Sequence, residues 1–236
     1  MNEPRRGLGR RLLRLLLWVL GGWVTVTAAL VLALRWIDPP TTAFMLEARL
    51  QENRFRLRHE WVDYRGISRH APLAVIAAED QLFPQHWGFD FKSIDDSIRD
   101  SRSGKRLRGA STLTQQVAKN LFLWGGQSFV RKGFEAYFTV LIETLWPKQR
   151  IIEVYLNVAE FGRGVYGVGA ASRHYFRKSA ARLTPAESAL LAAVLPSPRR
   201  MRVDAPSAYV RIRQDWILWQ MRGLGGTRYL MAYERN

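Results

Sequence analysis

Cysteine is absent from the 236 residues, which excludes disulfides, thiolate metal sites and thiol nucleophiles. Acidic residues are scarce, since 20 Asp and Glu stand against 36 Lys and Arg and give a formal net charge of +16. Histidine occurs only 4 times and without the spacing of a metal site. The hydrophobic fraction of 47% is nevertheless ample for a packed core, so the chain is not a disordered tail.

Charge is missing altogether from one stretch near the N-terminus, Leu15 to Leu34. As a helix this stretch is long enough to cross a hydrocarbon core of roughly 30 Å. The arginines within residues 1–14 predict a cytoplasmic N-terminus by the positive-inside rule. A cleaved signal peptide is the alternative, but its apolar core usually has about 7–15 residues and ends at a small-residue cleavage site. We therefore expect an uncleaved anchor, with the rest of the chain on the outer face.

The positive charge by itself would suit a nucleic-acid partner. A domain on the outer face of a membrane meets anionic headgroups and lipid phosphates instead. The predicted topology therefore favours membrane lipids as partners and predicts no nucleic acid. Solvated surface arginine remains the simpler explanation for many individual residues.

Composition and periodicity divide the chain into five parts and predict a mainly α fold. Helical patterns cover 43–60, 72–83 and 207–222, and Thr184 with Glu187 has the spacing of a capping box. In 207–222 the recurring apolar residues are Tyr209, Ile212, Trp216 and Trp219. The expected parts are a basic N-terminus at 1–14, an anchor at 15–35, a linker or juxtamembrane helix at 36–59, a folded domain at 60–225 and a tail at 226–236.

Residues 121–142 are unusually apolar for a soluble surface and include Arg131 and Lys132. A basic, amphipathic segment of this kind can lie in the membrane interface. Packing into a protein core explains the same pattern equally well. Both alternatives stay open at the level of sequence.

Two adjacent acids, Glu79 and Asp80, follow the apolar run APLAVIAA. If that run is a helix, the pair lies near its C-terminus, where the helix dipole disfavours negative charge. Partial burial would raise a carboxyl pKa and make the carboxylate a better proton acceptor. The pattern allows a catalytic acid pair, and it also allows a cap or a surface ion pair with arginine.

The segment GASTLTQQVAKN begins at Gly109 and places Thr112 and Gln115 at capping-box spacing. A basic, glycine-containing loop precedes it, and such a loop running into a helix N-terminus can hold phosphate. Its hydroxyls, amides and Lys119 add hydrogen-bond donors suited to a sugar or pyrophosphate. The following RKGFE, with Arg131, Lys132 and Glu135, offers more cations and a second acid, although a surface pair would explain it as well.

The stretch Gly162 to Gly167 matches the G-x-G-x-x-G pattern of dinucleotide-binding proteins. It follows KQRIIEVYLN, whose periodicity indicates a helix and not a Rossmann strand, and no βαβ alternation surrounds it. Tight turns that permit close helix packing explain the glycines better.

Taken together and in order, EDQLFPQHWG, GASTLTQQVAKN, RKGFE and KQRIIEVYLN resemble the peptidoglycan glycosyltransferases of glycosyltransferase family fifty-one. The resemblance spans roughly residues 60–200 and extends to GRGVYGVGAASRHYF and LTPAESALLAAVLPSP. It implies a lysozyme-like, mainly α glycosyltransferase domain with a membrane-associated jaw, of the monofunctional biosynthetic type. It also implies polymerisation of lipid II at the inner (cytoplasmic) membrane, with the catalytic domain on the periplasmic side.

The resemblance carries roles for individual residues. Glu79 matches the base that deprotonates the acceptor GlcNAc 4-hydroxyl, which attacks C1 of the donor MurNAc with inversion and release of undecaprenyl pyrophosphate. Glu135 matches a second acid that steadies the pyrophosphate or a divalent ion, Mg²⁺ or Mn²⁺. Trp87 and Ala110 depart from common family residues without touching these groups. The positions that match residues around the sugars and phosphates are Asp80, Phe83, His86, Ser111, Thr112, Gln116, Lys119, Asn120, Arg131 and Lys132.

The implied partners are lipid II, the growing lipid-linked glycan strand and proteins of cell-wall synthesis or division. Two other functions stay open. A lytic transglycosylase would also use a glutamate in a lysozyme-like fold, but it needs an acid for a glycosidic oxygen and no phosphate-binding cations. A basic, non-enzymatic membrane-surface scaffold would leave Glu79 and Glu135 unexplained.

Overall fold

The computed structural model describes residues 5–51, 57–91, 111–126 and 128–234. The chain divides into two compact units, Met1–Asp38 and Pro39–Asn236. The basic loop before Ser111, with Ala110, lies outside the described residues.

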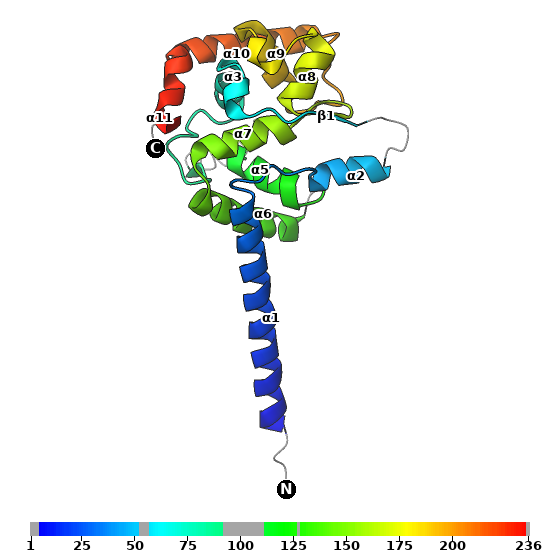
Figure 1. The fold of residues 1–236 in the computed structure, drawn as a ribbon, viewed down its shortest axis with the longest axis vertical. Coiled ribbons are helices and arrows are strands. Elements are labelled where there is room, and N and C mark those ends of the chain that lie inside the picture. The colour runs from blue at the N-terminus through cyan, green and yellow to red at the C-terminus, as the bar shows by residue number, and fades with distance from the viewer. Residues whose placement is uncertain (1–4, 52–56, 92–110, 127, 235–236) are drawn as a thin grey trace, which may run out of the picture. The chain divides into compact units, whose positions relative to one another are not determined.

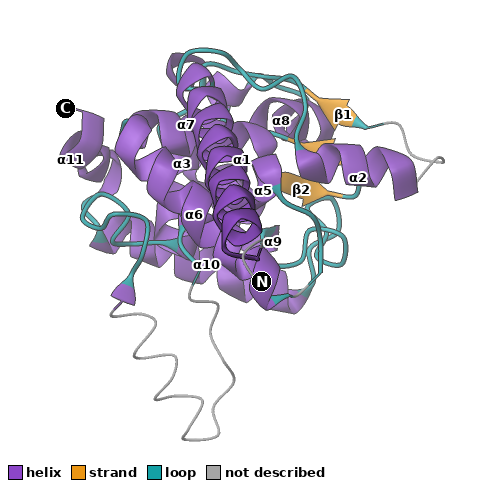
Figure 2. Cartoon of the chain, turned by 90° about the horizontal axis from the view of Figure 1, so that it is seen from below, coloured by secondary structure: helices purple, strands orange, loops and turns teal. Residues whose placement is uncertain are grey.

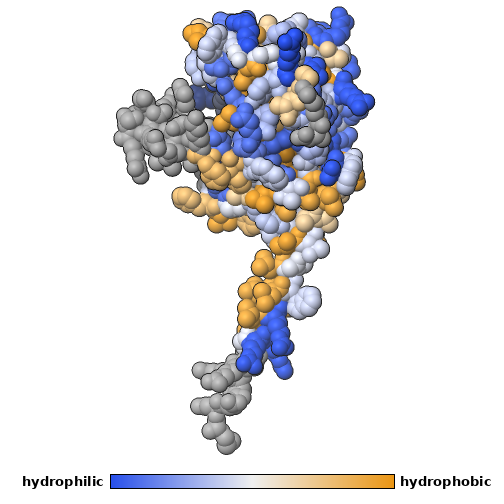
Figure 3. Space-filling model, turned by 90° about the vertical axis from the view of Figure 1, so that its left-hand side faces the viewer, coloured by the Kyte–Doolittle hydropathy of each residue, from blue (hydrophilic) through white to orange (hydrophobic). Residues whose placement is uncertain are grey.

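The first unit contains one long helix, α1 (Arg5–Ala33). Within it, Gly9–Ala33 is long and apolar enough to cross a membrane, which agrees with the anchor helix expected from the sequence. Figure 3 shows hydrophobic side chains along much of α1 and hydrophilic ones toward its N-terminal end. The helix ends before Leu34, where the chain turns toward Pro39 and Pro40.

The second unit is built mainly from helices, as predicted (Figure 1). Among the described residues, three short 3₁₀ helices and three short strands connect them. The α-helices are α2 (Ala43–Gln51), α3 (His70–Glu79), α5 (Leu113–Phe122), α6 (Phe129–Leu145), α7 (Lys148–Val158), α8 (Val168–Phe176), α9 (Pro185–Val194), α10 (Ala208–Gly223) and α11 (Met231–Glu234). The 3₁₀ helices are η1 (Tyr64–Gly66), η2 (Ala180–Arg182) and η3 (Gly226–Leu230).

Both capping boxes read from the sequence are confirmed. Thr112 caps α5, its hydroxyl accepting from the Gln115 N–H while the Gln115 side chain accepts from the Thr112 N–H. Thr184 and Glu187 cap α9 in the same way, with Pro185 at the first helical position. These reciprocal bonds satisfy N–H groups that have no partner inside the helix.

The core lies between two sets of helices, one formed by α3, α9 and α10 and the other by α5, α6 and α7. Helix α3 is buried on all sides from Ala71 to Ala77, as an apolar helix without a polar face should be. It ends at Glu79, several residues earlier than the expected 72–83, because the chain turns at Asp80 and continues as a tight turn toward Pro84. The acids therefore sit at the end of a buried helix.

One local prediction needs correction. Residues 58–59 form a strand, β1 (Arg58–His59), and not the end of a helix over 43–60. The glycine-rich stretch forms β2 (Glu160–Gly162) and β3 (Val165–Tyr166), an antiparallel pair against which β1 lies parallel beside α8 (Figure 2). Gly164 and Gly167 have φ of 73° and 82°, which explains the glycines as turn residues, and the Rossmann reading stays rejected.

Helix α10 confirms the helical spacing over 207–222, but the recurring apolar residues do not face the core. Tyr209, Ile212, Trp216 and Trp219 are exposed. The side chains that α10 buries are Val210, Gln214, Ile217 and Met221. Periodicity therefore predicted the helix and left the choice of face to the tertiary packing.

The apolar stretch 121–142 divides between core and surface. Leu121, Leu123, Phe138 and Ile142 are buried, which simple packing explains. Other large apolar side chains of the stretch are exposed, namely Trp124, Phe129, Val130, Phe134 and Val140.

The C-terminal residues expected as a tail pack onto the second unit as η3 and α11. Leu230 and Tyr233 are buried, and the Tyr64 hydroxyl donates to Glu234 Oε1 at 2.8 Å. Tyr229 donates to the carbonyl of Gln81 at 2.5 Å, which fixes the turn after α3 from this side.

Candidate active site

Glu79 is the last residue of α3 and is mostly buried, with 16% of its side chain exposed. Its Oε2 accepts from Gln116 Nε2 on α5 at 3.2 Å, and its Oε1 accepts from Arg213 Nη2 on α10 at 3.2 Å. Each carboxylate oxygen therefore has one donor from a different helix. The remaining lone pairs are available for a proton or a substrate hydroxyl.

Tyr155 on α7 fixes the orientation of the Gln116 amide. Its hydroxyl donates to Gln116 Oε1 at 3.1 Å, so that Nε2 points at Glu79. Tyr155 is fully buried, and burial raises the pKa of its hydroxyl well above the ordinary value. The hydroxyl therefore stays protonated and keeps acting as a donor.

Burial raises the pKa of Glu79 above the ordinary value for a carboxyl group, as the sequence predicted. The Gln116 hydrogen bond and the Arg213 charge act in the opposite direction and favour the carboxylate, while Asp80 raises the pKa further. Desolvation is the largest of these effects. A carboxylate with a raised pKa binds a proton more readily, which suits a general base.

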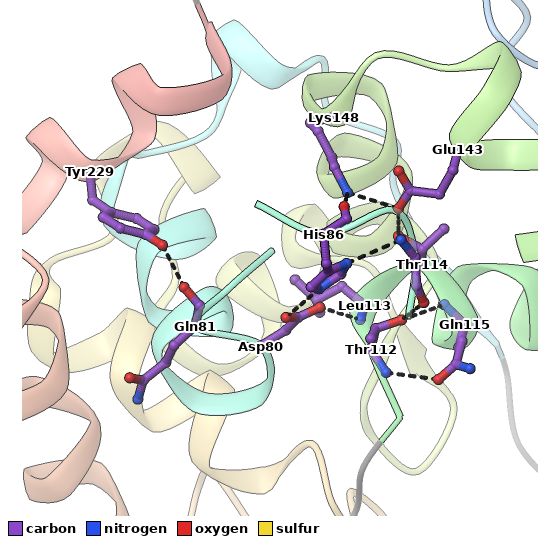
Figure 4. A network of polar contacts seen from close by, with 11 residues as sticks. Asp80, Gln81, His86, Thr112, Leu113, Thr114, Gln115, Glu143, Lys148 and Tyr229 are labelled. Carbon is purple, nitrogen blue, oxygen red and sulfur yellow. Dashed lines mark hydrogen bonds and ion pairs between the residues drawn. The ribbon is translucent and has the colours of Figure 1, made fainter. Parts of the chain in front are cut away.

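Asp80 is buried and joins α3 to α5 (Figure 4). Its Oδ2 accepts from the N–H of Leu113, the first residue of α5, at 3.0 Å. Its Oδ1 lies 2.8 Å from His86 Nε2. Because His86 Nδ1 accepts the Gly88 N–H at 3.1 Å, the imidazole proton lies on Nε2 and is donated to Asp80. Asp80 therefore fixes the positions of Leu113 and His86. The donors that hold Glu79 are different residues, Gln116 and Arg213.

Phe83 and Gly88 define the turn after α3. Phe83 is fully buried, and its ring meets His86 edge-on at 6.3 Å and Tyr233 at 5.9 Å between ring centroids. Gly88 has a φ of 77°, and its carbonyl accepts from the Thr112 hydroxyl at 2.7 Å. The turn is therefore pinned both to the core and to the start of α5.

Gly88→Ala should destabilise the fold. An alanine Cβ would lie 2.5 Å from Thr139 Cγ2, and the positive φ disfavours any side chain. We expect a loss of about 1–3 kcal/mol, which corresponds to a fall in melting temperature of roughly 2–12 °C. Thermal unfolding in detergent measures this. Gly133→Ala, which has no atom within 4 Å of the added carbon, is the matched control. An unchanged melting temperature for Gly88→Ala would contradict the steric argument.

Lys148 supports the same turn from α7 (Figure 4). Its Nζ donates to the His86 carbonyl at 2.6 Å and to Glu143 Oε1 at 2.8 Å, and it lies 4.6 Å from the Phe83 ring centroid. The Thr114 hydroxyl donates to the same Glu143 oxygen at 2.6 Å. These hydrogen bonds therefore connect α5, α6 and α7 to one another next to the turn that follows Glu79.

Glu135 on α6 is buried, with 4% of its side chain exposed, and pairs with two cations of its own helix. Arg131 Nη1 donates to Oε2 at 2.8 Å, and Lys132 Nζ donates to Oε1. Lys132 is half exposed and also reaches Ser111 Oγ at 3.4 Å. The structure thus brings RKGFE together with the start of the GASTLTQQVAKN segment.

Lys119 on α5 lies within the electrostatic reach of both acids. Burial lowers the pKa of its ammonium group, Glu135 raises it, Arg131 and Lys132 lower it, and Glu79 raises it. Lys119 follows Gln116 by one helical turn, so it lies on the same side of α5. Asn120 is half-buried in the last turn of this helix. We call Lys119, Arg131, Lys132 and Glu135 the cation cluster.

Two buried donors near these acids have no hydrogen-bond partner among the described residues. They are Nε of Arg131 and Nε of Arg213. A buried N–H without a partner costs free energy, so such groups need an explanation.

A resident divalent ion does not fit at Glu135. Both of its carboxylate oxygens already pair with cations, and two neighbouring positive charges oppose a third. Within the described ranges, no group of three or more His, Cys, Asp or Glu side chains could hold a metal. The expectation of Mg²⁺ or Mn²⁺ held by Glu135 is therefore not supported by this donor set.

Sequence reasoning missed several residues of this site. Arg213 lies far along the chain in α10, and no motif distinguishes it from the many other arginines. Tyr155 and Lys148 lie inside the KQRIIEVYLN motif, whose presence was noted without assigning them contacts. Of the predicted residues, Glu79 contacts Gln116 and Asp80 contacts His86, while Thr112 bonds to Gly88 in the same turn. The cation cluster lies beside them.

Comparison with known proteins identifies the family. The transglycosylase family model matches residues 47–222. A biosynthetic peptidoglycan transglycosylase of Xanthomonas campestris pv. campestris (strain B100) is 53% identical over 239 residues, covering 98% of this chain and 95% of the relative. Its counterpart from Ectopseudomonas mendocina (strain ymp) is 51% identical, covering 95% and 93%. That of Pseudomonas putida (strain KT2440) is 51% identical, covering 96% of both.

The chain therefore belongs to the transglycosylase family and is a peptidoglycan glycosyltransferase. It resembles the monofunctional biosynthetic members over nearly their whole length, as the four sequence motifs implied. The expected fold class is confirmed as well, a mainly α, lysozyme-like domain accompanied by one N-terminal apolar helix.

Proposed function

We propose that this glycosyltransferase polymerises glycan strands from lipid II, with Glu79 as the general base. The observation that carries the proposal is one carboxylate with a raised pKa, held by two donors, beside the cation cluster. A proton acceptor and a set of phosphate-binding cations in one site are what such a transfer requires. Support from the family extends to the reaction class, because the relatives' names specify biosynthetic peptidoglycan transglycosylases.

In the proposed step, Glu79 takes the proton of the acceptor GlcNAc 4-hydroxyl. The hydroxyl oxygen forms a bond to C1 of the donor MurNAc while the bond from C1 to the phosphate oxygen breaks, with inversion at C1. The electron pair leaves with undecaprenyl pyrophosphate. Cations placed where negative charge develops lower the barrier of such a step. Lys119, Arg131 and Lys132 take this role.

Glu135 orients this set of cations and does not touch the reacting atoms. Its two ion pairs hold Arg131 and Lys132 on one face of α6. The binding surface is completed or supported by Ser111, Asn120 and the turn residues Phe83 and His86. Asp80 and Thr112 are buried and position other groups. Asp80 accepts from the Leu113 N–H at the start of α5, and the Thr112 hydroxyl donates to the Gly88 carbonyl in the turn after α3.

The N-terminal helix is compatible with a single-pass anchor, and we propose that it holds the enzyme in the inner membrane with the catalytic domain on the periplasmic side. The exposed apolar residues of α6, with Phe129 99% exposed, suit contact with the membrane interface where the lipid carrier lies. Binding of the protein to vesicles containing anionic lipid tests this part. We expect Phe129→Ser to weaken that binding.

Replacing Arg213 should shift the pH dependence of the reaction. The Arg213 charge lowers the pKa of Glu79, so its removal in Arg213→Met raises that pKa further. Because the base acts only when deprotonated, the acidic limb of the kcat/KM profile should move to higher pH. Arg211→Met, on the same helix but exposed, is the matched control and should leave the limb in place. An acidic limb that stays fixed or moves to lower pH in Arg213→Met would contradict the proposed role of Glu79.

A lytic transglycosylase is the second candidate, because a carboxyl group with a raised pKa also suits a general acid. The cation cluster distinguishes the two, since a leaving sugar hydroxyl needs a proton and a leaving pyrophosphate needs positive charge. The test is to offer the full-length protein lipid II and isolated sacculi in parallel. Glycan polymer from lipid II with intact sacculi supports synthesis. Soluble muropeptides from sacculi without polymer from lipid II would overturn it.

A further inference from the structure

Helix α2 is anchored firmly to the catalytic domain at its N-terminal end. The Thr42 hydroxyl accepts from the Met45 N–H at 3.1 Å and so caps the helix. Thr42 and Met45 are 2% and 1% exposed, which places this first turn inside the domain. The position of Phe44, between these two residues, is therefore fixed by the packing on either side of it.

A second contact holds α2 against the end of α5. Glu47 Oε2 accepts from the Gly125 N–H at 2.8 Å. A Cβ at Gly125 would lie 2.9 Å from Glu47 Oε1, so glycine permits this close approach. Figures 1 and 2 show α2 beside α5, and the two helices are in contact.

Phe44 lies in the first turn of α2, and its ring faces Lys119 on α5. Lys119 Nζ lies 5.3 Å from the ring centroid, within the range of a cation–π interaction. Burial acts against the charged form of Lys119, and so do Arg131 and Lys132, whereas Glu135 and Glu79 favour it. The electron-rich face of Phe44 adds to the groups that favour the ammonium ion.

We propose that Phe44 is a positioning residue that holds the Lys119 ammonium group charged and directed into the cation cluster, so that helix α2 forms part of the donor-binding site. This inference rests on the proposed role of Lys119 at the pyrophosphate. It gives a function to Phe44, which precedes both the sequence motifs and the residues that the family model matches, 47–222.

A double-mutant cycle tests the inference. Phe44→Leu keeps an apolar side chain and removes the ring, and we expect KM for lipid II to rise about two- to tenfold with a smaller change in kcat. Inhibition by undecaprenyl pyrophosphate should weaken by a similar factor. In a Lys119→Ala background the same Phe44→Leu change should have less than about a twofold effect, because the group through which it acts is gone. Phe44→Trp, which retains a π face, should stay close to wild type.

The controls separate this inference from the proposed function. Phe44→Met removes the ring a second way, in case Phe44→Leu lowers the yield of folded protein. Leu50→Ala, on the same helix and 82% exposed, should change neither constant. Equal effects of Phe44→Leu in both backgrounds, or no effect in the wild type, would overturn the role of Phe44 while leaving polymerisation intact. If wild-type protein forms no polymer from lipid II, it is the proposed function that fails.

Discussion

Glu79→Gln is expected to reduce the rate of glycan polymerisation from lipid II by about 10²–10⁴-fold, the range over which a general base contributes. Glutamine keeps the size of the side chain and one acceptor oxygen for either Gln116 or Arg213, but it cannot accept the acceptor's proton. The defect should appear in kcat more than in KM, because the proton moves only in the transition state. Continuous measurement of polymer formation from purified lipid II in detergent gives both constants.

The same change at Glu60 provides the control. Glu60 pairs with Arg173 outside the site, and Glu60→Gln should polymerise at nearly the wild-type rate. The melting temperature of Glu79→Gln should also stay near that of the wild type, because its burial already opposes the charge that the substitution removes. Near-normal strands from a folded Glu79→Gln protein would remove Glu79 from the role of base.

Glu135→Gln is expected to have the second-largest effect, on both stability and donor binding. The substitution leaves Arg131 without its buried anionic partner, and losing one member of a buried pair costs about 3–5 kcal/mol. We expect a somewhat smaller loss, since Lys132 is half exposed and can return to solvent. With Arg131 and Lys132 no longer held on one face of α6, KM for lipid II should rise by about tenfold or more.

Glu153→Gln separates the two effects of Glu135→Gln. Glu153 on α7 pairs with Arg150 at 2.9 Å and accepts the Tyr64 N–H at 2.7 Å, away from the cation cluster. Its replacement should lower the melting temperature while KM for lipid II stays unchanged. If Glu135→Gln showed only the loss of stability and an unchanged KM, Glu135 would be a structural residue and would not organise the donor site.

The parts of the fold that the sequence predicted correctly depend on local chemistry. The capping boxes at Thr112 and Thr184 satisfy helix N–H groups within four residues of chain, so their spacing is sufficient evidence. The apolar run before Glu79 predicted a helix with one apolar face, and the structure buries that helix on all sides. The raised pKa of Glu79 followed from its place at the end of that run.

The parts that sequence reasoning missed depend on contacts between distant segments. Arg213 reaches Glu79 across 134 positions, and nothing local marks it. The strand at Arg58 exists because it pairs with Val165, more than a hundred residues away. The exposed aromatic residues of α10 show the same limit, since helical spacing places side chains on a face without saying which face the core covers.

The most direct measurement of the proposed reaction is its stoichiometry. Purified full-length protein is given lipid II, and the release of undecaprenyl pyrophosphate is counted against new glycosidic linkages in the same sample. We predict one pyrophosphate-bearing lipid released for each linkage formed, with both signals lost together in Glu79→Gln. Release of the pyrophosphate lipid without matching new glycosidic linkages, or new linkages without its release, would contradict glycosyl transfer from lipid II.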